Sequence, residues 1–144
     1  MTAEYKKPLP IPGGLSGTTT AEFTKPFWEA TKRHELVIPR CRTHDGFFFY
    51  PRELCPVCLS SDIEWAKVTG RGRVHAFTIV HQPNDPAFAE DAPYVYAVIQ
   101  LDEGVRMISN VIGLPPEEVT VDMPVVAVFE DVTPEWTLVK FRPA

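Results

Sequence analysis

The feature that most restricts the fold of this chain is a short segment, CRTHDGFFFYPRELCPVC (Cys41 to Cys58), which contains all three of its cysteines. Cys41 and His44 are separated by two residues, as are Cys55 and Cys58, so the segment reads C-x2-H-x10-C-x2-C. This spacing lets a tight knuckle turn aim both side chains at one ion, about 2.0 to 2.3 Å away. The segment therefore predicts a zinc ribbon with Cys41, His44, Cys55 and Cys58 as ligands.

The residues around these pairs are compatible with the zinc ribbon, but other shells remain open. Gly46 and Pro56 suit the two knuckle turns. The alternatives are a ribbon that has lost its metal and a shell in which Asp45 or water replaces His44. Iron is less favoured, because a rubredoxin-type site uses four thiolates and the chain has three cysteines. A closed four-ligand site has no position for substrate, so the expected role of zinc is structural; a zinc-dependent enzyme is the alternative if His44 is not a ligand.

From Leu36 onward the sequence has the character of β-strands. Three short runs rich in aliphatic and aromatic residues, LVIPR, FFFY and IEWAKV, lie around the cysteine pairs. After Gly70 come five longer runs: GRVHAFTIVHQ, YVYAVIQL, VRMISNVI, PVVAVFE and EWTLVKF. LDEG (Leu101 to Gly104) predicts a hairpin turn, and LPPEEV (Leu114 to Val119) predicts a helical turn. Five antiparallel strands with a helical element between the third and fourth are typical of a Greek-key oligonucleotide/oligosaccharide-binding (OB) barrel.

The residues before the ribbon differ in composition. Residues 1–18 are rich in proline and glycine and have almost no periodicity, which predicts an extended arm. Leu9, Ile11 and Leu15 favour an arm that lies along an apolar surface, for example on another subunit, and a disordered tail is the alternative. A helix is expected from Thr24 to Arg33, with Thr24 as its cap and Pro26 in its first turn.

These signals predict three segments: an arm over residues 1–18, a helix plus zinc ribbon over residues 19–69, and a barrel over residues 70–144. The expected fold class is mainly β, with an N-terminal helix and a rubredoxin-like zinc ribbon followed by a five-stranded OB-fold barrel. Gly70 and Gly72 are interpreted as a β-bulge where the ribbon meets the barrel.

Charge is unevenly distributed along the chain. The net charge is −5; residues 1–73 contain 11 Lys+Arg and 8 Asp+Glu, whereas residues 74–144 contain 3 and 11. The acidic barrel would repel a phosphate backbone, so nucleic acid is not an expected partner. A single-stranded nucleic-acid binder is the alternative function, because Tyr94 and Tyr96 could stack on bases, but Arg106 is then the only cation beside them. With no apolar stretch near the roughly 18 residues of a membrane span, we expect a cytoplasmic protein.

We identify no familiar catalytic motif in the sequence. It contains no G-x-S-x-G, H-E-x-x-H or phosphate-cradling G-x-x-x-x-G-K motif, and zinc would engage all three thiols. We therefore assign no catalytic residue. Lys67, Arg71 and Arg73 form a basic cluster at the junction of ribbon and barrel, which could receive a phosphate or pyrophosphate; a solvated run of charges is the alternative.

The order of these parts resembles one known family, the small zinc-ribbon and OB-fold proteins that accompany thiolase-fold enzymes acting on acyl-coenzyme A. The resemblance covers roughly residues 20–144. It rests on PFWEATKRHELVIPRC, the knuckles with CPVC, GRGRVHAFTIVHQP, APYVYAVIQLDEGVRMISNV and the ending VVAVFE…FRPA. Two positions depart from the family pattern: His44 stands where the first knuckle usually has its second cysteine, and His34 stands at the helix end where glycine is common.

The resemblance implies a non-catalytic accessory or scaffold subunit within a hetero-oligomer. Its partner would be a thiolase-fold subunit: a thiolase, a hydroxymethylglutaryl-CoA synthase, an acyltransferase or a thiolase-like retro-aldolase. The accessory chain would stabilise that partner and help enclose the coenzyme A thioester, a ligand shared by both chains. Whether the chain is itself an enzyme is left open by the sequence, although a non-catalytic subunit is the expected reading.

Overall fold

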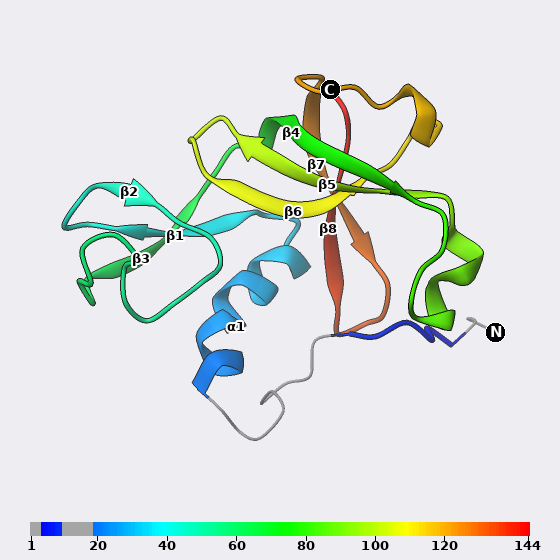
Figure 1. The fold of residues 1–144 in the computed structure, drawn as a ribbon. Helices are drawn as coiled ribbons and strands as arrows, with labels where there is room; N and C mark the ends of the chain where they lie inside the picture. Colours follow the sequence, from blue (N-terminus) through cyan, green and yellow to red (C-terminus); the bar gives the residue numbers. More distant parts are fainter. Residues whose placement is uncertain (1–3, 10–18) are drawn as a thin grey trace.

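The computed structural model describes residues 4–9 and 19–144, and their fold is mainly β (Figure 1). Helix α1 is followed by a small three-stranded sheet and then by a closed barrel of five strands, β4 to β8. This confirms the predicted fold class. Among the described residues, no helix combines the length and apolar character needed to span a bilayer.

Helix α1 spans Thr19–Lys32, so it begins before the predicted cap at Thr24. Pro26 therefore lies inside the helix and not in its first turn. At an interior position, proline removes one backbone hydrogen bond of the helix. Tertiary packing offsets this cost, because Phe27 and Thr31 are buried on the face turned toward the sheets. The helix ends as expected: His34 has φ 58°, the left-handed conformation of a C-terminal cap.

The ribbon sheet has the order β2-β1-β3, with β1 at Val37–Cys41, β2 at Gly46–Phe47 and β3 at Ile63–Lys67. The predicted strand FFFY is thus reduced to its first residue. Phe48 turns inward to a small cluster of buried residues with Cys41 and Cys55, and Phe49 packs on Phe27 of the helix. The aromatic run thus supplies contacts both to the small ribbon cluster and to the helix.

The barrel strands pair in the order β4-β5-β6-β8-β7, and β7 closes the barrel on β4. Their bounds are β4 Arg71–Val80, β5 Tyr94–Leu101, β6 Arg106–Val111, β7 Pro124–Asp131 and β8 Thr137–Pro143. The expectation of an all-antiparallel barrel is wrong at one place, because β6 and β8 pair in parallel at Val111 and Phe141. Since β7 crosses the barrel to pair with β4, the returning β8 runs in the same direction as β6.

The connections between barrel strands contain two 3-10 helices. One, at Pro116–Glu118, is the predicted helical turn, and Gly104 adopts the positive φ (91°) expected at the hairpin turn. The other, at Pro86–Asp91, was not predicted; Asp85 caps it by accepting a hydrogen bond from the Ala87 amide. This element lies between β4 and β5.

The bulge in β4 lies at Val74/Ala76 and not at the two glycines, which corrects the sequence interpretation. Backbone conformation and close packing explain why glycine stands at these two positions. Gly70 has φ 76°, and a Cβ on Gly72 would lie 2.4 Å from the carbonyl oxygen of Gln100 on the neighbouring strand. Both glycines let the backbone pack closely against the neighbouring strands where the chain enters the barrel.

The N-terminal residues 4–9 lie beside the 3-10 helix at Pro86–Asp91 (Figure 1), where Lys7 pairs with Asp91 at 2.6 Å. Tyr5 and Lys7 face Phe88 and Tyr94 across a shared hollow. This part of the arm therefore contacts the chain's own barrel. Ile11 and Leu15, on which the expectation of an apolar docking arm rests, lie outside the described residues.

One continuous core joins helix, ribbon and barrel. Phe27 of α1 and Ile38 of β1 belong to the same buried cluster as Val74, Ile99 and Phe141 of the barrel. The far end of the ribbon is different, because its buried residues, Cys41, Phe48 and Cys55, form a separate small cluster. Hydrophobic burial alone gives that end little stability.

Candidate metal centre

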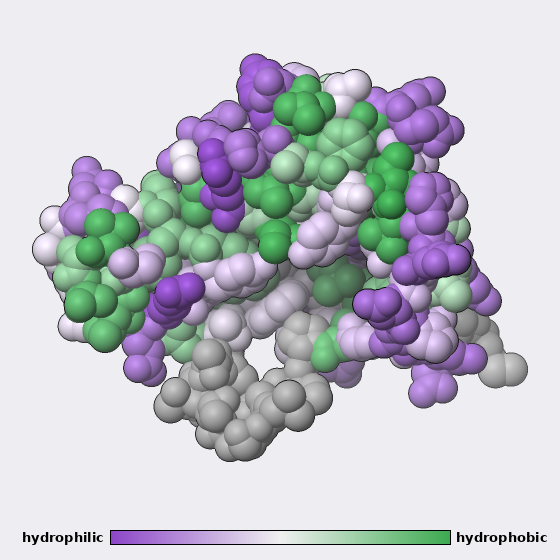
Figure 2. Space-filling view, in the orientation of Figure 1, coloured by the Kyte–Doolittle hydropathy of each residue, from purple (hydrophilic) through white to green (hydrophobic). Residues whose placement is uncertain are grey.

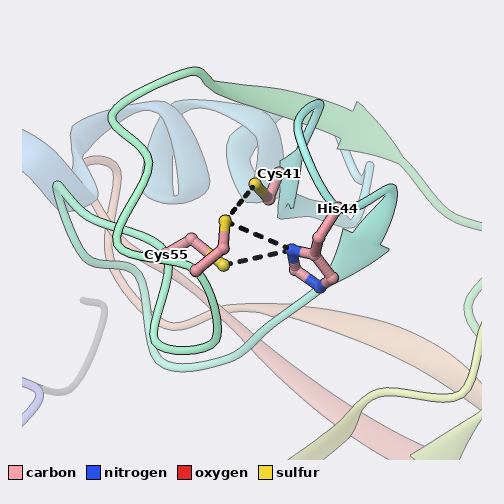
Figure 3. A group of neighbouring side chains, drawn as sticks. Cys41, His44 and Cys55 are labelled. Carbon is pink, nitrogen blue, oxygen red and sulfur yellow. Dashed lines mark hydrogen bonds between the residues drawn. The ribbon is translucent and has the colours of Figure 1, made fainter.

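The four predicted ligands come together at the end of the ribbon farthest from the barrel. Cys41 is the last residue of β1, His44 lies in the turn to β2, and Cys55 and Cys58 lie in the knuckle before β3. The side chains of Cys41, His44 and Cys55 point toward one another (Figure 3). Backbone hydrogen bonds shape the second knuckle, since the Leu59 amide donates to the Cys55 carbonyl at 2.9 Å.

The distances between the ligand atoms fit a tetrahedral zinc ion. All four atoms lie within 4.8 Å of one another. Cys41 Sγ is 3.6 Å from Cys58 Sγ, and His44 Nδ1 is 3.2 Å from Cys55 Sγ and 3.9 Å from Cys58 Sγ. Bonds of about 2.3 Å to sulfur and about 2.0 Å to nitrogen give tetrahedral edges of about 3.8 Å between sulfurs and about 3.5 Å between sulfur and nitrogen.

Two of the thiols, those of Cys41 and Cys58, have pKa values shifted in opposite directions. Burial raises the pKa of Cys41, but hydrogen bonds from the His44 and Thr43 amides, the His44 ring and Cys58 outweigh burial and lower this pKa to about 6. At Cys58 a hydrogen bond from the Ser60 amide lowers the pKa. Desolvation and the neighbouring sulfurs of Cys41 and Cys55 raise the pKa by more, so the net shift is upward. A bound divalent cation would reverse that repulsion, because its charge stabilises all three thiolates.

Gly46 makes room for the imidazole of His44. A Cβ at this position would lie 2.4 Å from His44 Nε2 and 3.0 Å from its Cδ2. The absence of a side chain at Gly46 is therefore what lets the ring lie with Nδ1 toward the sulfurs. Asp45, the alternative ligand, forms an ion pair with Arg40 instead.

The three residues of the predicted basic cluster have different surroundings. Lys67, on β3, is 3.6 Å from the carboxylate of Glu35, and Arg73, on β4, donates to the carbonyl oxygen of Asp122 at 2.9 Å. Arg71 and Arg73 alternate with the buried Gly72, so both project from the exposed side of β4. The structure thus places two cations side by side on the barrel and a third on the ribbon.

A polar network that the sequence analysis missed joins the helix end to the barrel. His34 Nε2 lies 3.0 Å from both carboxylate oxygens of Asp131, and the hydroxyl of the buried Thr137 donates to Asp131 Oδ1 at 2.6 Å. The Thr137 hydroxyl, and then His34, lower the pKa of Asp131. The His34 ring also stacks on Phe129. Because His34 and Asp131 are 97 residues apart, no local pattern could have revealed the pair.

Comparison with known proteins extends this description. Residues 28–64 match the family model of the ChsH2 rubredoxin-like zinc ribbon domain, and residues 65–130 match that of the ChsH2 C-terminal OB-fold domain. A DUF35 domain-containing scaffold protein of Methanocaldococcus jannaschii is 38% identical over 105 residues, which cover 71% of this chain and 73% of that protein. The chain belongs to the DUF35 family.

Two further proteins contain a region similar to this DUF35 protein. It is 40% identical over 119 residues to a probable enoyl-CoA hydratase alpha subunit of Thermomonospora curvata; the match covers 82% of this chain and only 37% of that subunit. The solved structure of an Ltp2-ChsH2(DUF35) aldolase contains a chain that matches with 37% identity and a TM-score of 0.75, covering 83% of this chain and 93% of that one. The chain therefore corresponds to a part of the hydratase subunit and to nearly all of the aldolase-associated chain.

Proposed function

We propose that this DUF35 protein is a non-catalytic scaffold subunit of a thiolase-fold acyl-CoA enzyme, in a hetero-oligomer whose partner makes or breaks a carbon–carbon bond. The observation that carries the proposal is its match, over most of both chains, to the DUF35 chain of an aldolase. The donor set agrees with this role, because the three thiols of the chain are gathered at one metal centre and none stands apart as a nucleophile.

Within this proposal, zinc is bound by Cys41, His44, Cys55 and Cys58. When bound, the ion supplies a cross-link between the two knuckles and positive charge for the thiolates, and a four-ligand shell has no open position for substrate. The chain's own residues do the rest: backbone amides orient the sulfurs and Gly46 admits the His44 ring. The metal thereby holds the shape of a surface and takes no part in a reaction.

The proposed shared ligand is the coenzyme A thioester, held between this chain and its partner. Arg71 and Arg73 project side by side from β4, and with Lys67 they are the residues that we assign to the phosphates of coenzyme A. Lys67 and Arg73 would exchange their contacts with Glu35 and the Asp122 carbonyl for phosphate oxygens. The condensing or cleaving residues would belong to the partner.

The test is to purify the chain from its own host under gentle conditions and to determine its metal content and companions by native mass spectrometry. One zinc ion per chain together with a thiolase-fold subunit is the expected result. Adding an acyl-CoA should then give a mass increase in the complex that the chain alone does not give. A zinc-bound chain without any companion would contradict the proposal and favour an independent binder, such as a protein for single-stranded nucleic acid.

A further inference from the structure

The second zinc knuckle exposes three large apolar side chains. Leu54 is 50% exposed, Val57 73% and Leu59 72%, and all three lie within the loop that carries Cys55 and Cys58. Side chains this exposed add little to the stability of the fold. Figure 2 shows hydrophobic surface at the free end of the ribbon, away from the barrel. We call Leu54, Val57 and Leu59 the knuckle patch.

The backbone at Leu59 is in an unfavourable conformation for its residue type. Its φ of 61° lies in the left-handed region, which glycine adopts freely and a leucine adopts at a cost. A glycine would satisfy the turn, since the Leu59 amide and not its side chain makes the contact with Cys55. The chain therefore places a large apolar group where folding alone would favour none.

A hollow lies beside the knuckle patch. It has a volume of about 440 Å³ and lies between the helix and the knuckle, lined by Phe23, Pro51, Leu54 and Leu59 among others. Protein interfaces concentrate their binding energy where a large side chain of one partner fills such a pocket on the other. A hollow of this size holds one or two aromatic or aliphatic side chains.

The charged residues around the ribbon indicate the chemistry of what covers the patch. Arg40 and Arg42 both pair with Glu64, Arg42 also pairs with Asp62, and Arg40 pairs with Asp45. Arg52 and Glu53, in the wall of the hollow, carry opposite charges. Three guanidinium groups and four carboxylates nearly cancel, so this surface carries little net charge. Such a surface matches an uncharged apolar protein surface and not a phosphate, a nucleic acid or an acidic peptide.

From these observations we propose that the knuckle patch is a docking surface for the enzyme subunit, which inserts an apolar side chain into the hollow between helix α1 and the second knuckle. This inference rests on the proposed function, since it names where the partner binds. The proposal also explains the role of the metal, because zinc would fix the loop that presents Leu54, Val57 and Leu59.

The variant Leu59→Gly separates docking from folding. Glycine relieves the left-handed backbone, so the melting temperature should stay the same or rise, whereas affinity for the purified companion subunit should fall about tenfold. Val57→Ser should weaken binding to a similar extent with unchanged zinc content. The matched control is Val121→Ser on the barrel, where an apolar side chain is 57% exposed away from the knuckle.

Affinities are measured by isothermal titration calorimetry with the companion subunit identified in the native purification, and zinc content by native mass spectrometry. Weaker binding by Leu59→Gly and Val57→Ser, with Val121→Ser like wild type, supports the docking surface. Unchanged affinity in the knuckle variants overturns it and leaves the scaffold function intact. A wild-type chain without a companion overturns both, and a homodimer that Leu59→Gly dissociates shows that the patch joins two copies instead.

Discussion

At the scale of single residues, Gly46 decides how the metal centre is built. The His44 ring occupies the space that a side chain at position 46 would need. Gly46→Ala should therefore displace the imidazole and lower zinc affinity about 10- to 100-fold, the usual range when the support of a ligand is lost. Competition with a fluorescent zinc chelator measures this affinity. Ser61→Ala, an exposed change near the second knuckle, is the control. Equal affinity in Gly46→Ala and wild type would exclude His44 as a ligand.

Thr137 makes the largest contribution to the lowered pKa of Asp131 at the junction of helix and barrel. Because hydrogen bonds lower the pKa of this carboxyl below its ordinary value of 3.8, Asp131 stabilises the fold above that pH, and the contribution is lost as the pH falls through the lower folded pKa. Thr137→Val removes the donor. We expect lower stability than wild type at pH 6, and a difference that shrinks toward pH 3.

Urea unfolding at both pH values measures this difference. Loss of zinc in acid affects wild type and variant alike and cancels in the comparison. Thr137→Ser keeps a hydroxyl and should retain the pH dependence of wild type. A difference of the same size at pH 6 and pH 3 would mean that Thr137 acts through packing alone.

At the scale of elements, the ribbon is stabilised in two different ways. Its base shares the barrel core through Ile38 and Leu36, whereas its far end has only the small cluster of Cys41, Phe48 and Cys55. Because this cluster is so small, we expect the binding of zinc to supply the folding free energy of this end. The barrel should not depend on the metal.

The variant Cys58→Ser tests whether the ribbon end depends on zinc while the barrel does not. Its packing cost is small, because Cys58 is exposed while Cys41 and Cys55 are buried. We expect loss of zinc, and hydrogen exchange of residues 41–60 that becomes fast while that of β5 and β6 stays slow. Ser61→Ala, an exposed change in the same loop, is the control. Retained protection around the knuckles in Cys58→Ser would show that the ribbon end folds without its metal.

At the scale of the whole molecule, the barrel provides a surface whose charge depends on position. The chain is acidic in its second half, yet Arg71 and Arg73 project together from β4 at the junction with the ribbon. This local cation pair is the one place on β4 where a phosphate group would meet two guanidinium groups. This pair is the reason why we propose that an acidic protein receives the anionic end of a coenzyme A ester there.

The double variant Arg71→Gln/Arg73→Gln should raise the KM of the assembled enzyme for its acyl-CoA about three- to tenfold, with a smaller change in kcat, because exposed ion pairs contribute modestly. Steady-state kinetics of the complex measures both constants. Arg106→Gln, on β6, removes a cation elsewhere on the barrel and should leave the KM unchanged. If the double variant also had a wild-type KM, Arg71 and Arg73 would be solvated charges.

Local patterns in the sequence determined much of this protein. The spacing of Cys41, His44, Cys55 and Cys58 predicted a group that the structure does bring together, and runs rich in β-branched and aromatic residues predicted all five barrel strands. Turn chemistry predicted Gly104 and the helical turn at Pro116–Glu118. These features depend on residues a few positions apart, so their physical causes can be read along the chain.

Contacts between distant residues decided the rest. The parallel pairing of β6 with β8 follows from where β7 closes the barrel, and burial of Phe27 and Thr31 offsets the cost of Pro26 inside α1. FFFY is a strand only at Phe47, and its next two residues pack against the ribbon cluster and the helix. The bulge in β4 lies at Val74/Ala76, whereas the sequence analysis had placed it at the glycines. His34, Asp131 and Thr137 meet only in the folded chain. Long-range packing outweighs local propensity at these positions, and no window of the sequence contains it.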